Sequence, residues 1–182
     1  MCSQIENGHF VQVRIYSIAS MFMESVVFLD ETKGNRILPI WIGPLESQSI
    51  MIKLSGYPSA RPMTHDLLFN LMKKTGCSLR DVCINDIEGN TFFAYLYIEQ
   101  TSGKKKETFK LDARPSDALA LAVRFGCPIF VHEDVFEKAS VLSKPISEDE
   151  VRQFKHTLSK LKPSDIIKNL QNRNKTTGND DR

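Results

Sequence analysis

The chain has 182 residues, of which 41% are hydrophobic and 25% are charged. This composition is ordinary for a globular protein and excludes disordered and collagen-like chains, and the length suits one domain with a small appendage. Lys and Arg number 24 against 22 Asp and Glu. Residues 1–146 carry 16 side chains of each sign, so the positive surplus lies in residues 147–182. A bulk positive field that would attract nucleic acid or an anionic membrane is therefore excluded.

No stretch of the chain predicts a membrane span or an export signal. The apolar segments near the start are interrupted by Arg14, Glu24 and Asp30 and fall short of the roughly 20 residues that a spanning helix needs. No charged and then apolar leader precedes a small-residue cleavage site. The four cysteines contain no C-x-x-C pair, which predicts free thiols in a reducing compartment. We therefore expect a cytoplasmic protein with no membrane partner.

Hydrophobic periodicity and turn residues divide the first three quarters of the chain into strands and helices. Strands are predicted where apolar and polar residues alternate, and helices where proline or a capping residue precedes apolar residues at intervals of three and four. The predicted elements are strands over 11–15, 25–29 and 36–42, helices over 44–54 and 64–75, strands over 79–87, 91–99 and 107–111, a helix over 115–125 and a strand over 128–131. This order predicts an α+β fold with a mixed, largely antiparallel sheet, a central buried helix and flanking helices.

Two of the predicted helices differ in their apolar surface. Residues 118–123 are apolar nearly all round, so the helix over 115–125 is expected to be the buried one. The helix over 64–75 is expected to be capped by Thr64. Its apolar stripe consists of Leu67, Leu68, Leu71 and Met72.

The end of the chain predicts a separate helix and a tail. Ser147 and Glu150 form a capping box ahead of apolar residues at helical spacing. From Ser164 onward the chain becomes rich in Asn, Lys, Thr and Asp, which is typical of a disordered polar tail. We therefore predict a domain over 1–140, a C-terminal helix over 141–163 and a tail over 164–182.

The first group of residues suited to chemistry is Arg61-Pro62-Met63-Thr64-His65-Asp66, at the start of a predicted helix. Backbone amides and the helix dipole attract anions at such a position. One interpretation gives Arg61 a phosphate to bind, His65 a water to orient or deprotonate, and Asp66 a metal or general-base role. The alternative is a capped helix start with a dipole-matching acid and a surface histidine.

The second group is Asp112-Ala113-Arg114-Pro115-Ser116-Asp117, at the corner between a strand and the buried helix. Asp112 and Asp117 can face one crevice across this corner, and paired carboxylates suit a hard divalent cation. Arg114 is suited to bidentate binding of a phosphate. The alternative is internal: Arg114 pairs with Asp112 or Asp66, and Asp117 only complements the helix dipole.

The third group surrounds Trp41 and Glu46. Trp41 is either a core residue or a surface on which a base stacks. Glu46 is either a further metal ligand or an acid in the first turn of a helix. The chain lacks G-x-G-x-x-G, P-loop, G-x-S-x-G and H-E-x-x-H motifs. The dinucleotide-binding, P-loop, α/β-hydrolase and zinc-protease classes that these motifs define are therefore not supported.

Taken together, the three groups resemble the bifunctional nuclease domain family in order and spacing. The resemblance covers about residues 10–138, and its matching blocks are 36–43, 61–68 and 112–122. It implies an α+β domain and, for some members of the family, cleavage of both DNA and RNA.

We therefore predict a divalent-metal-dependent nuclease that hydrolyses DNA and RNA phosphodiesters with little sequence specificity. The predicted catalytic residues are His65, Asp66, Asp112 and Asp117, the substrate-binding residues are Arg61 and Arg114, and the ligands of Mg²⁺ or Mn²⁺ are Asp112, Asp117, Asp66 and Glu46. The alternative is a non-catalytic regulatory or protein- and ligand-binding module whose Arg and Asp clusters are structural ion pairs. DNA or RNA is the expected partner, and the sequence leaves room for a homo-oligomer.

Overall fold

The computed structural model describes residues 9–20, 23–57, 59–103 and 105–144, and the structural statements below concern these residues. The chain divides into two compact units, Met1–Leu142 and Ser143–Arg182. The predicted C-terminal helix over 141–163 lies almost entirely outside the described residues, and the predicted tail lies wholly outside them. Both stay predictions.

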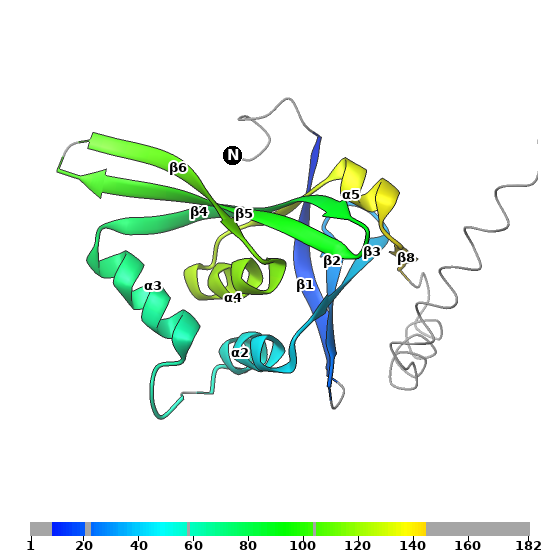
Figure 1. Cartoon of the computed structure of the whole chain (residues 1–182), viewed down its shortest axis with the longest axis horizontal. Coiled ribbons are helices and arrows are strands. Elements are labelled where there is room, and N and C mark those ends of the chain that lie inside the picture. Colours follow the sequence, from blue (N-terminus) through cyan, green and yellow to red (C-terminus); the bar gives the residue numbers. More distant parts are fainter. Residues whose placement is uncertain (1–8, 21–22, 58, 104, 145–182) are drawn as a thin grey trace, which may run out of the picture. The chain divides into compact units, whose positions relative to one another are not determined.

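The described part of the chain is an α+β structure, which confirms the predicted fold class (Figure 1). Its elements are β1 (Phe10–Ser20), β2 (Ser25–Glu31), β3 (Arg36–Ile42), α2 (Pro44–Ser55), α3 (Thr64–Lys74), β4 (Cys77–Glu88), β5 (Thr91–Ser102), β6 (Lys105–Ala113), α4 (Pro115–Phe125), β7 (Ile129–His132), α5 (Glu133–Lys138) and β8 (Leu142–Ser143). Each strand and helix predicted between residues 11 and 131 is present, whereas α5 and β8 were not predicted.

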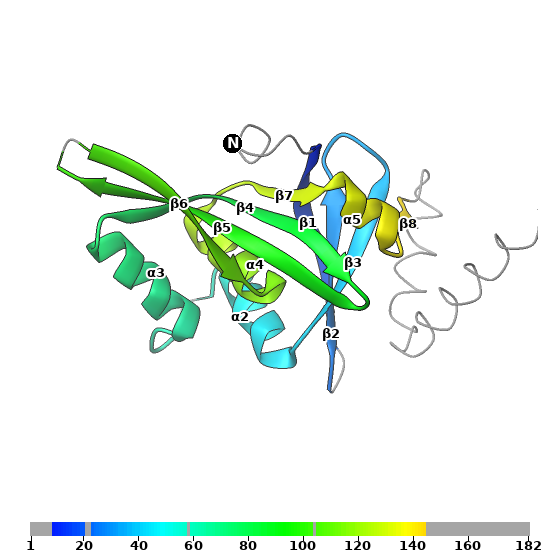
Figure 2. The same cartoon turned by 45° about the horizontal axis from the view of Figure 1, so that its top comes forward.

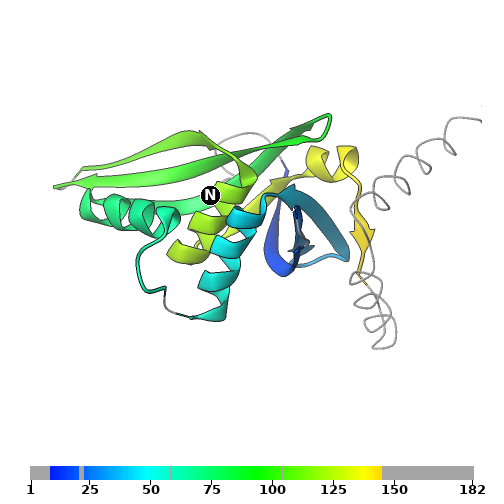
Figure 3. The ribbon, with the colours of Figure 1, turned by 60° about the horizontal axis from the view of Figure 1, so that its bottom comes forward.

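The strands of the first unit form a mixed sheet in the order β6-β5-β4-β7-β1-β2-β3 (Figure 2). Neighbouring strands are antiparallel, except that β4 and β7 run parallel. Helix α4 packs on β4 and β5, α3 packs on β4, and α2 packs on β1 and β2, with α4 between the other two helices (Figures 1 and 3). The main core therefore forms between α4 and the sheet.

Local sequence explains where α2 and α4 begin and end. Each helix starts with a proline, Pro44 or Pro115, whose fixed φ and missing N–H suit the first helical position. Each ends at a glycine in the left-handed region, Gly56 with φ 72° and Gly126 with φ 65°. The predicted burial of α4 is confirmed, because its residues from 118 to 122 are at most 1% exposed.

Helix α3 differs from the prediction in its cap and in its apolar stripe. Its N-cap is Met63, whose N–H donates to Asp66 Oδ2 at 2.9 Å, so Thr64 is already helical and is not the cap. Among the predicted stripe residues only Met72 is buried. Leu67 and Leu71 are 65% and 56% exposed. Periodicity shows that a helix has an apolar side, but it does not show that the rest of the chain covers that side.

Two further observations bear on the sequence predictions. Within the described ranges, no helix is long and apolar enough to cross a membrane. Cys77 and Cys127 carry free thiols, whereas Cys83 is disulfide-bonded. The prediction of free thiols is therefore wrong for Cys83, because the spacing of cysteines in the sequence does not tell which sulfur atoms meet in the fold.

Candidate functional site

A chain of hydrogen-bonded side chains links the starts of α2, α3 and α4. We call it the polar network, and its members are Glu46, Ser49, His65, Asp66, Arg114, Asp117 and Arg124. The network joins residues from all three groups that the sequence singles out. It is therefore the candidate functional site.

At one end of the network, Arg114 bridges two carboxylates. Its Nε donates to Asp117 Oδ2 at 2.7 Å and its Nη2 donates to Asp117 Oδ1 at 3.1 Å. Its Nη1 lies 3.2 Å from Glu46 Oε1. Arg114 is the N-cap residue before Pro115, so the corner between β6 and α4 aims it at both acids. The sequence left Asp112 or Asp66 as the internal partner of Arg114, and the partners are instead Asp117 and Glu46.

The His65 ring is held by a hydrogen bond at each nitrogen. Its Nε2 lies 3.1 Å from Asp117 Oδ1, and its Nδ1 lies 2.9 Å from Ser49 Oγ. A neutral imidazole fits this arrangement when the Ser49 hydroxyl donates to Nδ1 and Nε2–H donates to Asp117. Both nitrogens are then engaged, and neither has a lone pair left for water. In this geometry His65 positions Asp117, and the predicted activation of water by His65 stays without support.

The order Ser49, His65, Asp117 resembles the triad of serine hydrolases, but the geometry does not provide a nucleophile. Ser49 is 1% exposed, and its Oγ already accepts a hydrogen bond from Arg124 Nη2 at 3.1 Å. In the hydrolase triad the serine contacts Nε2 and the acid contacts Nδ1, which is the reverse of the contacts here. Ser49 therefore supports His65 from inside the protein.

At the other end of the network, Arg124 is a buried cation with its side chain 2% exposed. Its Nε donates to Asp66 Oδ1 at 2.7 Å, and its Nη1 donates to the carbonyl oxygen of Ala120 at 2.8 Å. Sequence reasoning missed Arg124 and Ser49. The available signal was a single charged residue on a helix that is otherwise apolar nearly all round, since a buried charge must find partners.

Both aspartates of the network have a lowered pKa. Burial raises the pKa of Asp117, but the hydrogen bonds from Arg114 and His65 outweigh burial and hold it below its ordinary value. For Asp66, burial is likewise outweighed by the hydrogen bonds from Arg124 and the Met63 amide, so its pKa is also lowered. A carboxylate with a lowered pKa is a weak base at neutral pH. Asp66 and Asp117 are therefore better suited to holding cations than to moving protons.

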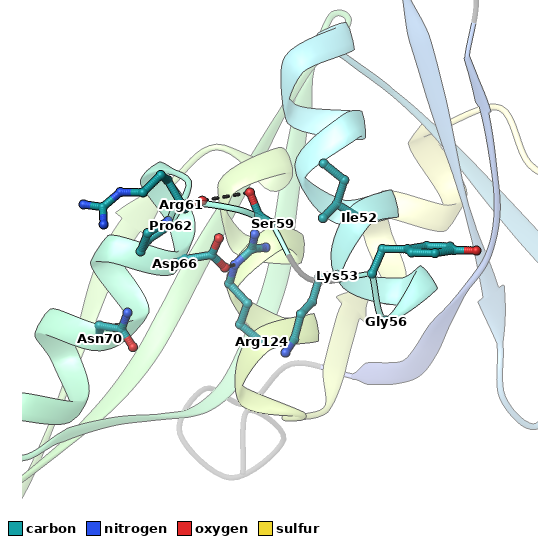
Figure 4. Close-up of a pocket in the computed structure, with 10 residues that line it drawn as sticks. Ile52, Lys53, Gly56, Ser59, Arg61, Pro62, Asp66, Asn70 and Arg124 are labelled. Carbon is teal, nitrogen blue, oxygen red and sulfur yellow. Dashed lines mark hydrogen bonds and ion pairs between the residues drawn. The ribbon is translucent and has the colours of Figure 1, made fainter.

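Two surface hollows adjoin the network. The first, of about 340 Å³, is lined by Asp66 and Arg124 together with Lys53 and Arg61. Figure 4 shows the Asp66 and Arg124 side chains pointing toward each other, whereas the Arg61 side chain extends away from them. The second hollow, of about 270 Å³, is lined by Glu46 and Arg114, and also by Trp41, Asn90 and Phe92. Each end of the network therefore opens to a different hollow.

Residues 27–144 match the family model of the bifunctional nuclease domain. The chain belongs to this family. Uncharacterized protein Rv1829 of Mycobacterium tuberculosis is 38% identical over 152 residues, which are 79% of this chain and 88% of that protein. Bifunctional nuclease 2 of Arabidopsis thaliana is 29% identical over 109 residues, 60% of this chain and 33% of the plant protein. Bifunctional nuclease 1 of Oryza sativa subsp. japonica is 26% identical over 111 residues, 61% of this chain and 33% of the rice protein.

Family membership confirms the resemblance stated from the sequence, and it bears directly on the candidate site. The matched range contains the whole polar network. The chain spans about a third of the length of each plant relative, so what those whole proteins do is carried over here only as a proposal.

The predicted metal site of four acids is not assembled in the described part of the chain. Among the residues that the structure describes, no three His, Cys, Asp or Glu side chains are grouped to hold a metal ion. Asp112 is the main reason. Asp112 stands opposite Tyr95 of β5, and Tyr95 packs with Tyr97 and Cys83 on one face of the sheet. The next residue of β5, Leu96, packs with α4 on the other face.

Directly opposed residues share a sheet face and successive residues alternate between faces. Asp112 therefore lies on the face away from α4 and Asp117, and the predicted pairing of these two acids is corrected. Asp66 is also separated from Glu46, because Arg124 holds it at the other hollow.

Proposed function

We propose that the chain is a nuclease that hydrolyses DNA and RNA phosphodiesters with little sequence specificity. The observation that carries the proposal is the bridge of Arg114 to Glu46 and Asp117. The Arg114 side chain is 66% exposed, so the N–H groups of Nη1 and Nη2 that Glu46 and Asp117 do not use are accessible to a phosphate, which they can bind through two hydrogen bonds. The names of the plant relatives, bifunctional nucleases, support a phosphodiester as the substrate.

The proposal includes Mg²⁺ or Mn²⁺ as cofactor, with Glu46 and Asp117 as its protein ligands. These two carboxylates already converge on one cation, the Arg114 guanidinium, at 3.2 and 2.7 Å. Two carboxylates match the usual coordination of Mg²⁺, which binds one or two carboxylates and completes its coordination shell with waters and substrate phosphates. The ion would supply polarisation of the phosphate and a bound water of lowered pKa.

The remaining network residues have positioning and binding roles in this proposal. His65 fixes the orientation of Asp117, and Ser49 fixes His65. Arg114 stabilises the negative charge that builds on phosphate oxygens in the transition state. Lys53 and Arg61 line the other hollow and bind further phosphates of the strand. Because residues 1–146 carry no net charge, binding depends on these placed cations.

A non-catalytic module that binds an anionic ligand is the second candidate. The mutual pairing of acids and arginines favours it, because Asp66 and Asp117 each have both carboxylate oxygens engaged by protein donors. Such pairing is also what structural ion pairs require.

The decisive experiment is cleavage of labelled single-stranded DNA and RNA by the purified full chain with Mg²⁺, with Mn²⁺ and with a chelator. We expect metal-dependent cleavage that falls by about 100-fold or more in Glu46→Gln and Asp117→Asn. Asp86→Asn is the matched control, since this acid pairs with Lys138 outside the network. Unchanged cleavage in the Glu46→Gln and Asp117→Asn double variant would refute the proposed site. Salt-sensitive binding without cleavage would instead favour the non-catalytic module.

A further inference from the structure

An apolar surface remains open on the side of the sheet where α3 lies. Phe109 and Leu111 of β6 are 43% and 51% exposed, and Leu67 and Leu71 of α3 are 65% and 56% exposed. Phe109 and Leu111 stand opposite Ile98 and Leu96, which belong to the same core as Met72 of α3. The exposed residues of β6 therefore share the side of the sheet on which α3 packs (Figure 1). Phe109 and Leu111 lie two positions apart on the same face of this strand, and neighbouring exposed apolar residues are a candidate contact for another chain.

Strand β6 also ends the sheet. It pairs with β5 without a register shift along its whole length, from Lys105 to Ala113, and it is the first strand in the sheet order. Its outer row of backbone N–H and C=O groups has no partner strand in the part of the chain that the structure describes. A regular edge of nine residues without proline is a template for pairing with another strand.

We propose that β6 pairs antiparallel with β6 of a second copy of this chain, with Phe109 at the two-fold axis. When two identical antiparallel strands are related by a two-fold axis, their side chains of one face lie on the same side of the joined sheet. The numbers of two directly opposed residues then differ by an even number. Placing Phe109 at the axis opposes Lys106 with Asp112 twice and uses all nine residues of β6.

Other registers are less favourable in charge or in length. An axis at Thr108 opposes Lys106 with Lys110, and an axis at Lys110 opposes that lysine with itself. An axis at Leu111 opposes Lys110 with Asp112 but pairs only residues 109–113. Like charges directly opposite each other destabilise a strand pair, and opposite charges stabilise it. Asp112 makes no ion pair with another described residue. Its charge is therefore available for Lys106 of the second copy, which also pairs with Glu99 of its own chain.

The first test measures the mass of the full chain in solution by light scattering and sedimentation over a range of concentrations. We expect a dimer for the wild-type chain and a monomer for Phe109→Lys with an unchanged circular dichroism spectrum. Met23→Lys is the matched control, because Met23 is 76% exposed outside this surface, and it should remain dimeric. A wild-type monomer at every concentration, or a dimer that survives Phe109→Lys, overturns the proposal.

The second test exchanges charges to fix the register. Asp112→Lys alone opposes two lysines, and Lys106→Asp alone opposes two aspartates, so each variant should be monomeric. An equal mixture of the two variants restores both opposite-charge pairs and should form a heterodimer. Restoration by a mixture of Asp112→Lys with Lys110→Asp, and not with Lys106→Asp, would overturn the register. Because neither test measures cleavage, failure of the dimer and failure of the nuclease proposal are distinguishable.

Discussion

Replacing Arg124 by methionine should destabilise the protein strongly. The substitution keeps an unbranched chain of similar volume in a site where the arginine side chain is 2% exposed. It removes the donors to Asp66, to the Ala120 carbonyl and to Ser49. Breaking a buried ion pair by removing one partner costs about 3–5 kcal/mol. The Asp66 side chain is 30% exposed, so water compensates part of its loss and we expect a cost of about 3 kcal/mol, at the low end of that range.

Urea unfolding followed by circular dichroism measures this cost directly. A thermal scan should show a midpoint lower by about 6–12 °C, because 1 kcal/mol corresponds to about 2–4 °C in a chain of this size. Asp66→Asn alone should cost at least as much, about 3 kcal/mol or more, because it leaves the Arg124 cation, 2% exposed, without its counter-charge. The double variant should cost at least about 1 kcal/mol less than the sum of the single variants. A loss below about 1 kcal/mol for Arg124→Met, or strictly additive losses, would refute the buried ion pair.

Three further predictions concern acid sensitivity, packing and backbone conformation. Asp66 and Asp117 have a lowered pKa in the folded state, so they contribute stability above their unfolded pKa of about 4 that is lost as pH falls through the lower folded values. The urea midpoint of the wild-type chain should therefore fall below pH 4, and less steeply in Asp66→Asn, whereas equal slopes would contradict the assignment. Leu119→Ala should cost about 3 kcal/mol because Leu119 is 0% exposed; in the same unfolding assay Leu67→Ala should stay within about 0.5 kcal/mol. Gly126→Ala should cost about 1 kcal/mol because of its φ of 65°, and an unchanged midpoint would be evidence against the left-handed helix end.

The sequence predicted the elements well because their limits are local properties. Proline at the starts of α2 and α4 and glycine at their ends are readable without knowing the fold. The apolar residues that surround α4 on nearly all sides likewise predicted that this helix is buried. The exposure of Leu67 and Leu71 of α3 was not predictable in this way, because it depends on whether a part of the chain distant in sequence packs over them.

The candidate site was predictable in its location but not in its pairing. All three groups of residues do lie at helix starts, but, apart from the bonds between Arg114 and Asp117, the bonds within the network join residues far apart in the chain. Arg124 and Asp66 are 58 positions apart, and Arg124 and Ser49 are 75 apart. The error over Asp112 has a different origin. Proximity in sequence to Asp117 suggested a shared crevice, whereas the pairing of β6 with β5 directs the Asp112 side chain to the opposite face.

The charge at the Arg114 bridge yields a prediction in which binding and cleavage change in opposite directions. Glu46 and Asp117 carry two negative charges against the single positive charge of Arg114, so a phosphodiester meets net repulsion there unless a divalent cation is bound. Removing one carboxylate charge at about 4 Å should relieve at least about 1 kcal/mol of repulsion, or about fivefold in affinity.

In a chelator, Asp117→Asn should therefore bind a labelled single-stranded oligonucleotide at least about fivefold more tightly than the wild-type chain in an anisotropy titration. With Mg²⁺ the same variant should lose cleavage. Asp86→Asn is the control for the added net charge, because it removes one acid outside the network. Equally tighter binding by both variants would mean that only the total charge of the chain matters. Weaker binding by Asp117→Asn would mean that this carboxylate contributes to binding the nucleic acid and does not serve to bind a cation.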